Sequence, residues 1–507
     1  MDGFLPHEIL TMITDKFSDN SATLYSCILI NKNWYSAAIQ HLWSNPFTLL
    51  CAYRYRCVDD YRRKAKNLLT TFIECFTDME SIKEESVSLY LERKHSKKLI
   101  FDYSLYLKEI YFGEVQDLLC KWCHLKLDDC KFSHDLVDRM AVGIIRFAIQ
   151  YCPRLKTLFF PHKFPSILLI QSLAFARDLP QLRNFIWASH YSHKEVFIAL
   201  SKVAHNLELI SVDFRTRRNC LDEGSMDAFQ ALIRSQHRLK TVRIRKLNIG
   251  MDFMLELLQT QSSSLEWLSF EHTDFGSDDS KFGPFKFPQL KRLKLGQCVT
   301  ISTHGLASII MADLPNLQQL IIDPGITIPI KFMKQMLQKH GRSLTSATLK
   351  LSNSNVDIVS SICQNLRQLD ISMSKELIMP VVCMLANIPN LHSLTINSLS
   401  ERDPPFLGNL FNELAKHQLS HLHDLSLSNM DSCHVDSLKK FLSGSRPPLR
   451  SLTIGRTCVM TEAHINVILD HLKDTLKFLT IYFDINAVST KCIGRARRIL
   501  RRFYRPF

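Results

Sequence analysis

A leucine-containing pattern that recurs at a nearly constant interval constrains the fold of this 507-residue chain more than any other feature. The unit reads Leu-x-x-apolar-x-apolar, and successive units begin about 27 residues apart on average. A repeat of this length cannot bury its apolar side chains alone, so neighbouring repeats must stack and share one core. The thirteen units begin at Leu155, Leu182, Leu207, Leu239, Leu265, Leu290, Leu317, Leu344, Leu366, Leu391, Leu422, Leu449 and Leu476.

Each unit predicts one short strand followed by one helix. The fourth and sixth positions, such as Leu293 and Leu295, are two residues apart and therefore point to one face of a strand. The spacing then becomes helical, as in Ile465 and Ile468. One strand and one helix per repeat define a leucine-rich repeat. We predict an α/β fold in which residues 151–490 form a solenoid with parallel strands on the concave side and helices on the convex side.

The first 47 residues have a different, helical pattern. Pro6 suits an early helical position, Ser21 is a candidate N-cap of a second helix, and a third helix is expected from Trp34 to Trp43. Three short helices in about 40 residues bury too little surface to be comfortably stable alone, so this unit needs a partner. The apolar residues that share one stripe of the first helix are Leu5, Ile9, Leu10, Ile13 and Phe17.

Residues 5–47 resemble the F-box. The resemblance rests on Leu-Pro-x-Glu-Ile at 5–9, Ser-Cys-x-x-x-Asn-Lys-x-Trp at 26–34 and Leu-Trp at 42–43. It implies that residues 1–47 bind a Skp-type adaptor and, through it, a cullin scaffold that supports ubiquitin transfer. Cysteine-containing repeats such as 290–298 resemble those that often follow an F-box. The residues to which the resemblance assigns adaptor binding are Leu5, Pro6, Glu8, Ile9, Leu24, Cys27 and Trp34.

The remaining segments are less regular. Residues 48–150 are expected to form a helical linker with a helix at 135–150, and Leu107 to Phe112 has the pattern of an irregular first repeat. Two long intervals between repeats, 32 and 31 residues, predict additional loops. One loop would hold Arg215, Arg217 and Arg218, and the other would hold Asp403, Pro404 and Pro405.

The C-terminal segment 491–507 contains one lysine, six arginines and no acidic residue. Ala496, Ile499, Leu500 and Phe503 have helical spacing, which predicts a basic helix that caps the last repeat. Contact with an anionic membrane, nuclear import and nucleic-acid binding are the alternatives. Because this segment supplies seven of the +14 net charges, the rest of the chain is only mildly basic, and nucleic-acid binding is not favoured.

The composition excludes several classes of protein. The sequence has no leader-like apolar segment and no run of about 18 apolar residues, so we expect no membrane span and a location in the cytoplasm, the nucleus or both. Its 15 cysteines are scattered and are expected to be reduced core residues. Cys120, Cys123 and His124 match a haem-attachment spacing, with Cys130 nearby, but core packing is favoured. We predict no metal site, no cofactor and no enzymatic activity, because common nucleotide-binding and hydrolase motifs are absent.

The strand register predicts a substrate-binding surface. Positions between the buried apolar residues of three consecutive units turn outward and present four cations and one tryptophan, a combination suited to an acidic or phosphorylated peptide. The chain would then be a non-catalytic substrate receptor of an SCF-type ubiquitin ligase. The alternative is an F-box-tethered scaffold that binds RNA or another polyanion. The predicted substrate-binding residues are Arg243, Arg245, Trp267, Arg292 and Lys294.

Overall fold

The computed structural model contains two compact units, residues 1–247 and 248–507, which are described separately. The structure describes residues 5–18, 20–51, 67–69, 71, 103–126, 134–160, 173, 178–188, 194–214, 224–247, 251–273, 285–298, 307–323, 330–399, 406–429, 434–455, 459–483, 488–500 and 502–504. The two loops predicted around Arg217 and Pro404, and Cys130, lie outside these residues.

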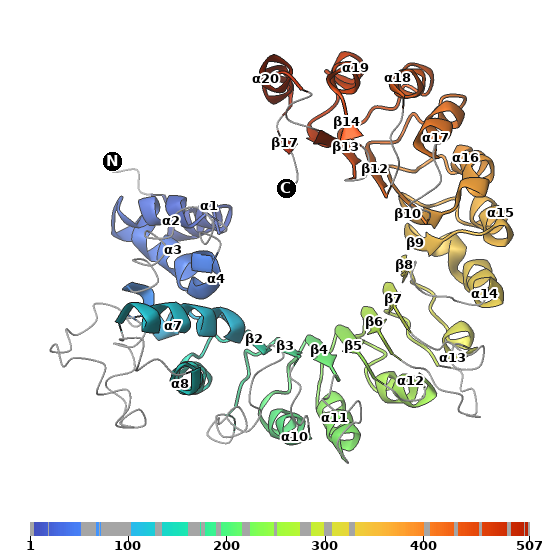
Figure 1. The fold of residues 1–507 in the computed structure, drawn as a ribbon. Helices are drawn as coiled ribbons and strands as arrows, with labels where there is room; N and C mark the ends of the chain where they lie inside the picture. The colour runs from blue at the N-terminus through green and yellow to red at the C-terminus, as the bar shows by residue number, and fades with distance from the viewer. Residues whose placement is uncertain are drawn as a thin grey trace. The chain divides into compact units, whose positions relative to one another are not determined.

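The first unit begins with helices α1 (His7–Asp15), α2 (Ser21–Ile28), α3 (Lys32–Leu42) and α4 (Pro46–Cys51) (Figure 1). Asn20, and not Ser21, is the N-cap of α2, because its side chain accepts a hydrogen bond from the Thr23 N–H at 3.1 Å. Asn31 caps α3 in the same way. Two asparagines therefore fix the starts of consecutive short helices.

The rest of the first unit alternates strands and helices. Strands β1 to β5 lie side by side in chain order, and every described pair of neighbours is parallel. The helix predicted at 135–150 is α8. The elements are η2 (Tyr103–Tyr106), β1 (Glu109–Tyr111), α7 (Phe112–Lys126), α8 (His134–Tyr151), β2 (Thr157–Phe160), β3 (Asn184–Trp187), α10 (Lys194–Val203), β4 (Leu209–Asp213), α11 (Ser225–Arg234) and β5 (Thr241–Arg245).

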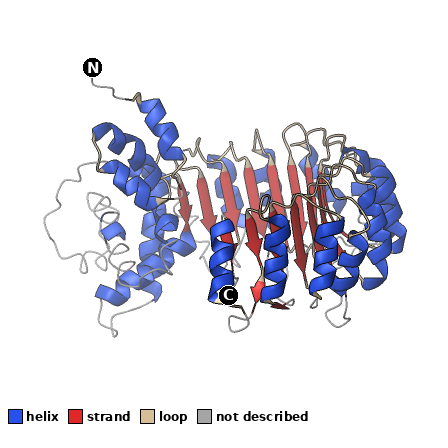
Figure 2. Cartoon of the chain, turned by 90° about the horizontal axis from the view of Figure 1, so that it is seen from above, coloured by secondary structure: helices blue, strands red, loops and turns tan. Residues whose placement is uncertain are grey.

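The second unit continues the alternation, and its main sheet follows the chain from β6 to β13, then β15 and β17. Figure 2 shows the strands as a layer with helices along them. A two-stranded sheet pairs β14 (Val459–Met460) with β16 (Tyr482–Phe483). The other elements are α12 (Met251–Gln259), β6 (Trp267–Glu271), β7 (Arg292–Gly296), α13 (Ala307–Met311), β8 (Gln319–Ile322), α14 (Ile330–His340), η4 (Gly341–Ser343), β9 (Ser346–Lys350), α15 (Asn353–Ile362), β10 (Gln368–Met373), η5 (Lys375–Leu377), α16 (Ile378–Ala386), β11 (Ser393–Ser398), α17 (Phe406–Leu414), β12 (Asp424–Ser428), α18 (Val435–Gly444), β13 (Ser451–Ile454), α19 (Glu462–Leu472), β15 (Phe478–Thr480), α20 (Thr490–Ile499) and β17 (Arg502–Tyr504).

The predicted repeat register is confirmed. Each of the thirteen predicted units contains a strand that begins two residues after its first leucine, as β7 does after Leu290. Leu293 and Leu295 are both buried, whereas Arg292, which precedes Leu293, is exposed and Lys294, which lies between the two leucines, is half-buried. Parallel strands in chain order, each followed by a return segment, form the α/β architecture of a leucine-rich-repeat array within each unit.

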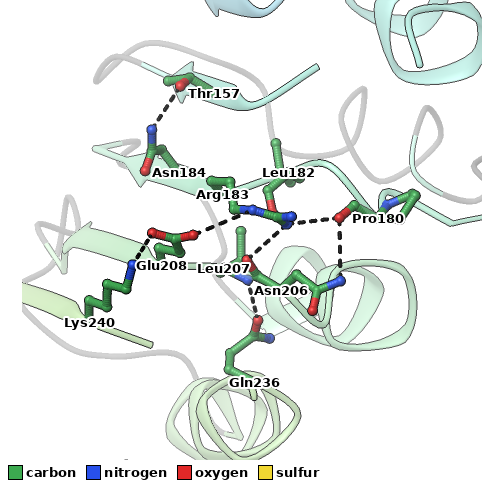
Figure 3. Close-up of polar contacts among 10 residues, drawn as sticks. All are labelled: Thr157, Pro180, Leu182, Arg183, Asn184, Asn206, Leu207, Glu208, Gln236 and Lys240. Atoms are coloured by element: carbon green, nitrogen blue, oxygen red, sulfur yellow. Dashed lines mark hydrogen bonds and ion pairs between the residues drawn. The ribbon is translucent and has the colours of Figure 1, made fainter. Parts of the chain in front are cut away.

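Side chains at the turns connect one repeat to the next. The Asn206 amide donates to the Pro180 carbonyl at 3.3 Å, and the Asn316 amide donates to the Pro288 carbonyl at 2.7 Å (Figure 3 shows the first pair). Each asparagine immediately precedes the first leucine of its repeat. Since the acceptor carbonyl belongs to the preceding repeat, the asparagine fixes the distance between neighbouring turns.

The C-terminal segment differs from the expected continuous helix. Helix α20 ends at Ile499, and residues 502–504 form strand β17, which pairs in parallel with β15. Phe503 therefore lies on a strand and not on the helical stripe of Ala496. The Arg495 guanidinium contacts the Asp470 carboxylate of α19 at 2.6 Å, and Ala496 is completely buried. The last helix and strand thus extend the array by one unit.

Candidate partner-binding surfaces

Helix α1 divides the apolar residues predicted to share one stripe. Leu10 and Thr14 are buried, and the Thr14 hydroxyl is within hydrogen-bonding distance of the Ala37 carbonyl of α3, at 3.4 Å. Leu5 and Ile9 are exposed, as is Met12, at 65 % of its maximal surface. The helix is therefore rotated so that its buried face contacts α3 and a second apolar surface faces solvent.

Helix α2 has the same division between core and surface. Leu24 and Cys27 of α2 pack with Ala38 of α3, and Trp34 packs against this cluster. The cluster lies in the core of helices α1 to α4, which we call the helical unit. Because Leu24 has no exposed surface and Cys27 has only 7 %, we assign them to internal packing and not, as expected from the resemblance, to direct contact with a partner. Pro6 and Glu8 are exposed.

The N-terminal helices concentrate exposed apolar surface. Half of the fourteen large apolar side chains that are exposed among the described residues lie between residues 5 and 30. Large apolar groups gathered in this way mark interaction surfaces more often than single exposed ones do. The sequence pattern missed Met12, Tyr25, Leu29 and Ile30, which helical spacing alone could not distinguish from core residues. The seven are Leu5, Ile9, Met12, Phe17, Tyr25, Leu29 and Ile30.

The helical unit is connected directly to the first strand of the repeats. The Ser44 carbonyl accepts hydrogen bonds from the N–H groups of Lys108 and Glu109, at 2.9 and 3.0 Å. The rings of Trp43 and Tyr103 stack with their centroids 4.0 Å apart. These contacts extend the edge of β1 into the helical unit, so a partner held by α1 and α2 would be fixed relative to β1.

The predicted substrate-binding residues are distributed over both units. Arg243 and Arg245 lie on β5 of the first unit and are half-buried. In the second unit, Trp267 on β6 is directly opposite Arg292 on β7, and the guanidinium carbon lies 5.6 Å from the ring centroid. This distance allows a cation–π interaction. Within the second unit, the register therefore brings an arginine and a tryptophan together as predicted.

The positive charge of Lys294 is neutralised by a carboxylate within the chain. Its ammonium lies 2.6 Å from the Glu271 carboxylate, and both side chains are about three-quarters buried. Glu271 was among the outward positions predicted for its strand, but the ion pair that it forms with Lys294 was not predicted. Lys294 is therefore less available to an anionic ligand than Arg292, which remains exposed.

The sheet face of the later repeats has a different chemistry. From β9 to β13 the half-buried outward positions are mainly serine and threonine, and Asp370 lies among them. Burial raises the pKa of Asp370, although the Asn397 amide donates to its carboxylate at 3.0 Å. Hydroxyl and amide groups can form hydrogen bonds with a bound chain. The hydroxyl-bearing positions are Ser346, Thr348, Ser393, Thr395, Ser426, Ser428, Ser451 and Thr453.

The described residues contain no group of three or more His, Cys, Asp or Glu side chains placed to hold a metal. Cys120 lies on α7, and burial raises the pKa of its thiol, which disfavours the thiolate that metal ligation requires. Within the described part of the chain, no helix has both the length and the apolar character of a membrane span.

Comparisons with known proteins add little to these observations. No family model matches the chain, and no curated protein matches it. The yeast Rad7–Elc1 complex is similar over 75 % of this chain and 90 % of that chain, with 12 % sequence identity and a TM-score of 0.28. The leucine-rich repeat-containing protein LegL7 from Legionella pneumophila is similar over 66 % of this chain and 95 % of that chain, with 12 % identity and a TM-score of 0.33. The fold assignment therefore rests on the strand order and repeat register within each unit.

Proposed function

We propose that this chain is a non-catalytic substrate-recognition subunit of an SCF-type ubiquitin ligase. The N-terminal helices would bind a Skp-type adaptor, and the repeats would bind a protein substrate that has an acidic or phosphorylated segment. Holding the substrate close to the ubiquitin-transferring component replaces a bimolecular encounter by an effectively unimolecular one. No side chain of this chain needs to take part in the chemistry.

The observation that carries the proposal is the exposed apolar surface of α1 and α2. Leu5 and Ile9 belong to the F-box-like motif and are exposed, whereas Leu24 and Cys27 of the same motif form the core beneath. A small unit that keeps large apolar groups in solvent gains stability when a partner covers them, at about 25 cal/mol per Å² of apolar surface. The motif thus supplies both a core and a surface for an adaptor.

The alternative, a scaffold for RNA or another polyanion, would need a track of uncompensated cations, because such binding depends on neutralising many phosphates. In the second unit, Lys294 pairs with Glu271, and Arg495 pairs with Asp470. These pairs weigh against a polyanion track along this unit.

The test is co-purification of the full-length chain with a purified Skp-type adaptor. The L5A/P6A double variant should lose the adaptor, whereas M311A, which truncates an exposed apolar side chain far along the sequence, should retain it. Circular dichroism should show the same helix and strand signal for both variants. Retention of the adaptor by L5A/P6A at the level of the unmodified chain would refute the docking assignment. Capture of RNA but of no adaptor would support the scaffold alternative.

A further inference from the structure

The first unit contains a pocket at the edge of its sheet where the strands begin. The pocket has a volume of about 380 Å³ and is lined by Lys108, Pro153, Arg154, Lys156 and Gln181. Each of these residues lies within four positions before the start of β1, β2 or β3. Three of the five lining side chains are cations and none is acidic.

The backbone places the two lysines on neighbouring repeats. The Lys108 carbonyl accepts hydrogen bonds from the N–H groups of Lys156 and Thr157 at 2.6 and 3.0 Å, and the Lys156 carbonyl accepts from Arg183 and Asn184 at 2.8 and 2.9 Å. Lys108 and Lys156 therefore occupy the same position of consecutive repeats, each directly before a strand, and neighbouring strands lie about 4.8 Å apart. Their spacing is a consequence of the repeat register.

Lys108 and Lys156 begin a row of basic residues at the starts of the strands, and the later members of this row, Arg183 and Lys240, are neutralised. Arg183 lies 3.5 Å from the Glu208 carboxylate, which also contacts the Lys240 ammonium at 2.8 Å (Figure 3). The next two cations of the row thus share one anion. Lys108, Arg154 and Lys156 have no ion pair with any described residue. The uncompensated charge is confined to the first two repeats.

The pKa of Lys108 is affected by both its burial and the neighbouring cations. Burial lowers the pKa of Lys108, and Lys156 and Arg154 lower it further. Asp15 and Glu109 act in the opposite direction and do not restore the ordinary value. Burial also lowers the pKa of His41, and Lys108 adds to this effect. An anion in the pocket would relieve the repulsion among these groups.

We propose that this pocket binds a phosphate group. A phosphomonoester carries about −1.5 to −2 charges at pH 7 and three acceptor oxygens, which match three cations better than a carboxylate does. The Arg154 guanidinium can donate two parallel hydrogen bonds, and the lysines act as point charges. Gln181 adds an amide donor. Because the unpaired positive charge is confined to the first two repeats, the pocket suits a single phosphate group and not an extended polyanion.

The proposal deepens the proposed function, since it names a chemical group that the repeats would recognise in a substrate. It does not depend on adaptor docking, and phosphate binding can be measured with the full-length chain alone. The L5A/P6A variant should bind phosphate normally. Loss of the adaptor and loss of phosphate are therefore separate results.

The experiment titrates the full-length chain with inorganic phosphate and with N-acetyl-phosphoserine amide, following ³¹P NMR and calorimetry. K156Q and R154Q should each weaken phosphate binding at least tenfold. K240Q is the matched control, because Lys240 has the same repeat position but is paired with Glu208. Higher salt should weaken binding to the unmodified chain.

Tighter binding of the phosphoserine derivative than of inorganic phosphate would identify a phosphorylated side chain as the ligand, and equal binding would identify free phosphate. The proposal is overturned if the unmodified chain shows no saturable binding of either probe. It is also overturned if K156Q and R154Q, with unchanged melting temperatures, bind as tightly as K240Q.

Discussion

The Arg292 guanidinium carbon lies 5.6 Å from the ring centroid of Trp267 on the neighbouring strand. The two residues are directly paired in the register of β6 and β7, where an arginine above an indole forms a flat, cationic surface. Arginine and tryptophan are also enriched among the residues that contribute most of the binding energy at protein interfaces. This pair is therefore the part of the second unit's sheet face that we expect a substrate to contact.

Charge reversal at Arg292 should release a bound substrate and leave adaptor binding intact. The R292E variant replaces a cation with an anion and removes the cation–π interaction, so an acidic segment would be repelled. The measurement is quantitative capture of ubiquitination substrates by the full-length chain with the proteasome blocked.

The matched control for this prediction is K334E, which makes the same charge change on the exposed side of α14. Equal substrate recovery by R292E and K334E would contradict the assignment. The exposed Phe478 of β15 would then become the strongest candidate.

A charge at a core position should unfold several repeats together. Leu293 is 1 % exposed, and L293D would bury an unpaired carboxylate at a cost of about 3 to 5 kcal/mol. Because each repeat is stabilised by its neighbours, the loss should extend beyond β7. Chemical unfolding followed by circular dichroism measures the change in stability.

Q368D provides the comparison for L293D, since Gln368 is the exposed first residue of β10. It should change stability by less than about 0.5 kcal/mol, as is usual for surface substitutions. If L293D had the unfolding curve of Q368D, the buried position of Leu293 would be refuted.

The sequence predicted the repeats well because their register depends on a local rule. A leucine followed by apolar residues at the fourth and sixth positions can bury those side chains only as a strand in a stacked array, and β7 at Leu293 and Leu295 follows this rule. The buried face of the first helix could not be predicted from the spacing of its apolar residues alone. Its apolar residues cover more than one face, and contact with α3 decided that Leu10 is buried and Ile9 exposed.

Other features depend on contacts between repeats, which no local pattern specifies. The pocket at Lys108 and Lys156 forms because two residues 48 positions apart align at the starts of neighbouring strands. The neutralisation of Lys294 follows from Glu271 in the preceding repeat. Phe503 lies on a strand because the backbone of β15 is available for pairing, which overrides the helical spacing.

The stability of the second unit should fall with acid through His340. Burial lowers the pKa of this imidazole to about 4; Lys339 acts in the same direction and Asp313 opposes it. Between pH 4 and 6.5 the unfolded chain binds a proton that the folded chain does not, so the free energy of unfolding decreases as the pH falls. The slope contributed by one such group is at most about 1.4 kcal/mol per pH unit.

The measurement is the free energy of unfolding of the H340Q variant across this pH range. Glutamine does not titrate, so the slope between pH 4 and 6.5 should be smaller than in the unmodified chain, whatever the stability of the variant at neutral pH. Parallel pH profiles for H340Q and the unmodified chain would show that His340 does not titrate as proposed.

The C-terminal helix should stabilise the last repeats chiefly through its buried face and only slightly through its charges. Ala496 has no exposed surface, and Cys492 beside it is buried, so A496D would place a carboxylate between α20 and α19 and separate them. R495A removes the Asp470 contact, an exposed ion pair worth no more than about 1 kcal/mol.

A496D should therefore release the end of the array, which amide hydrogen exchange would detect as faster exchange in α19 and β15. R495A and the exposed-site control R497D should leave that exchange nearly unchanged. If R495A accelerated exchange as much as A496D, ionic attachment, and not apolar capping, would hold the C-terminal segment on the repeats.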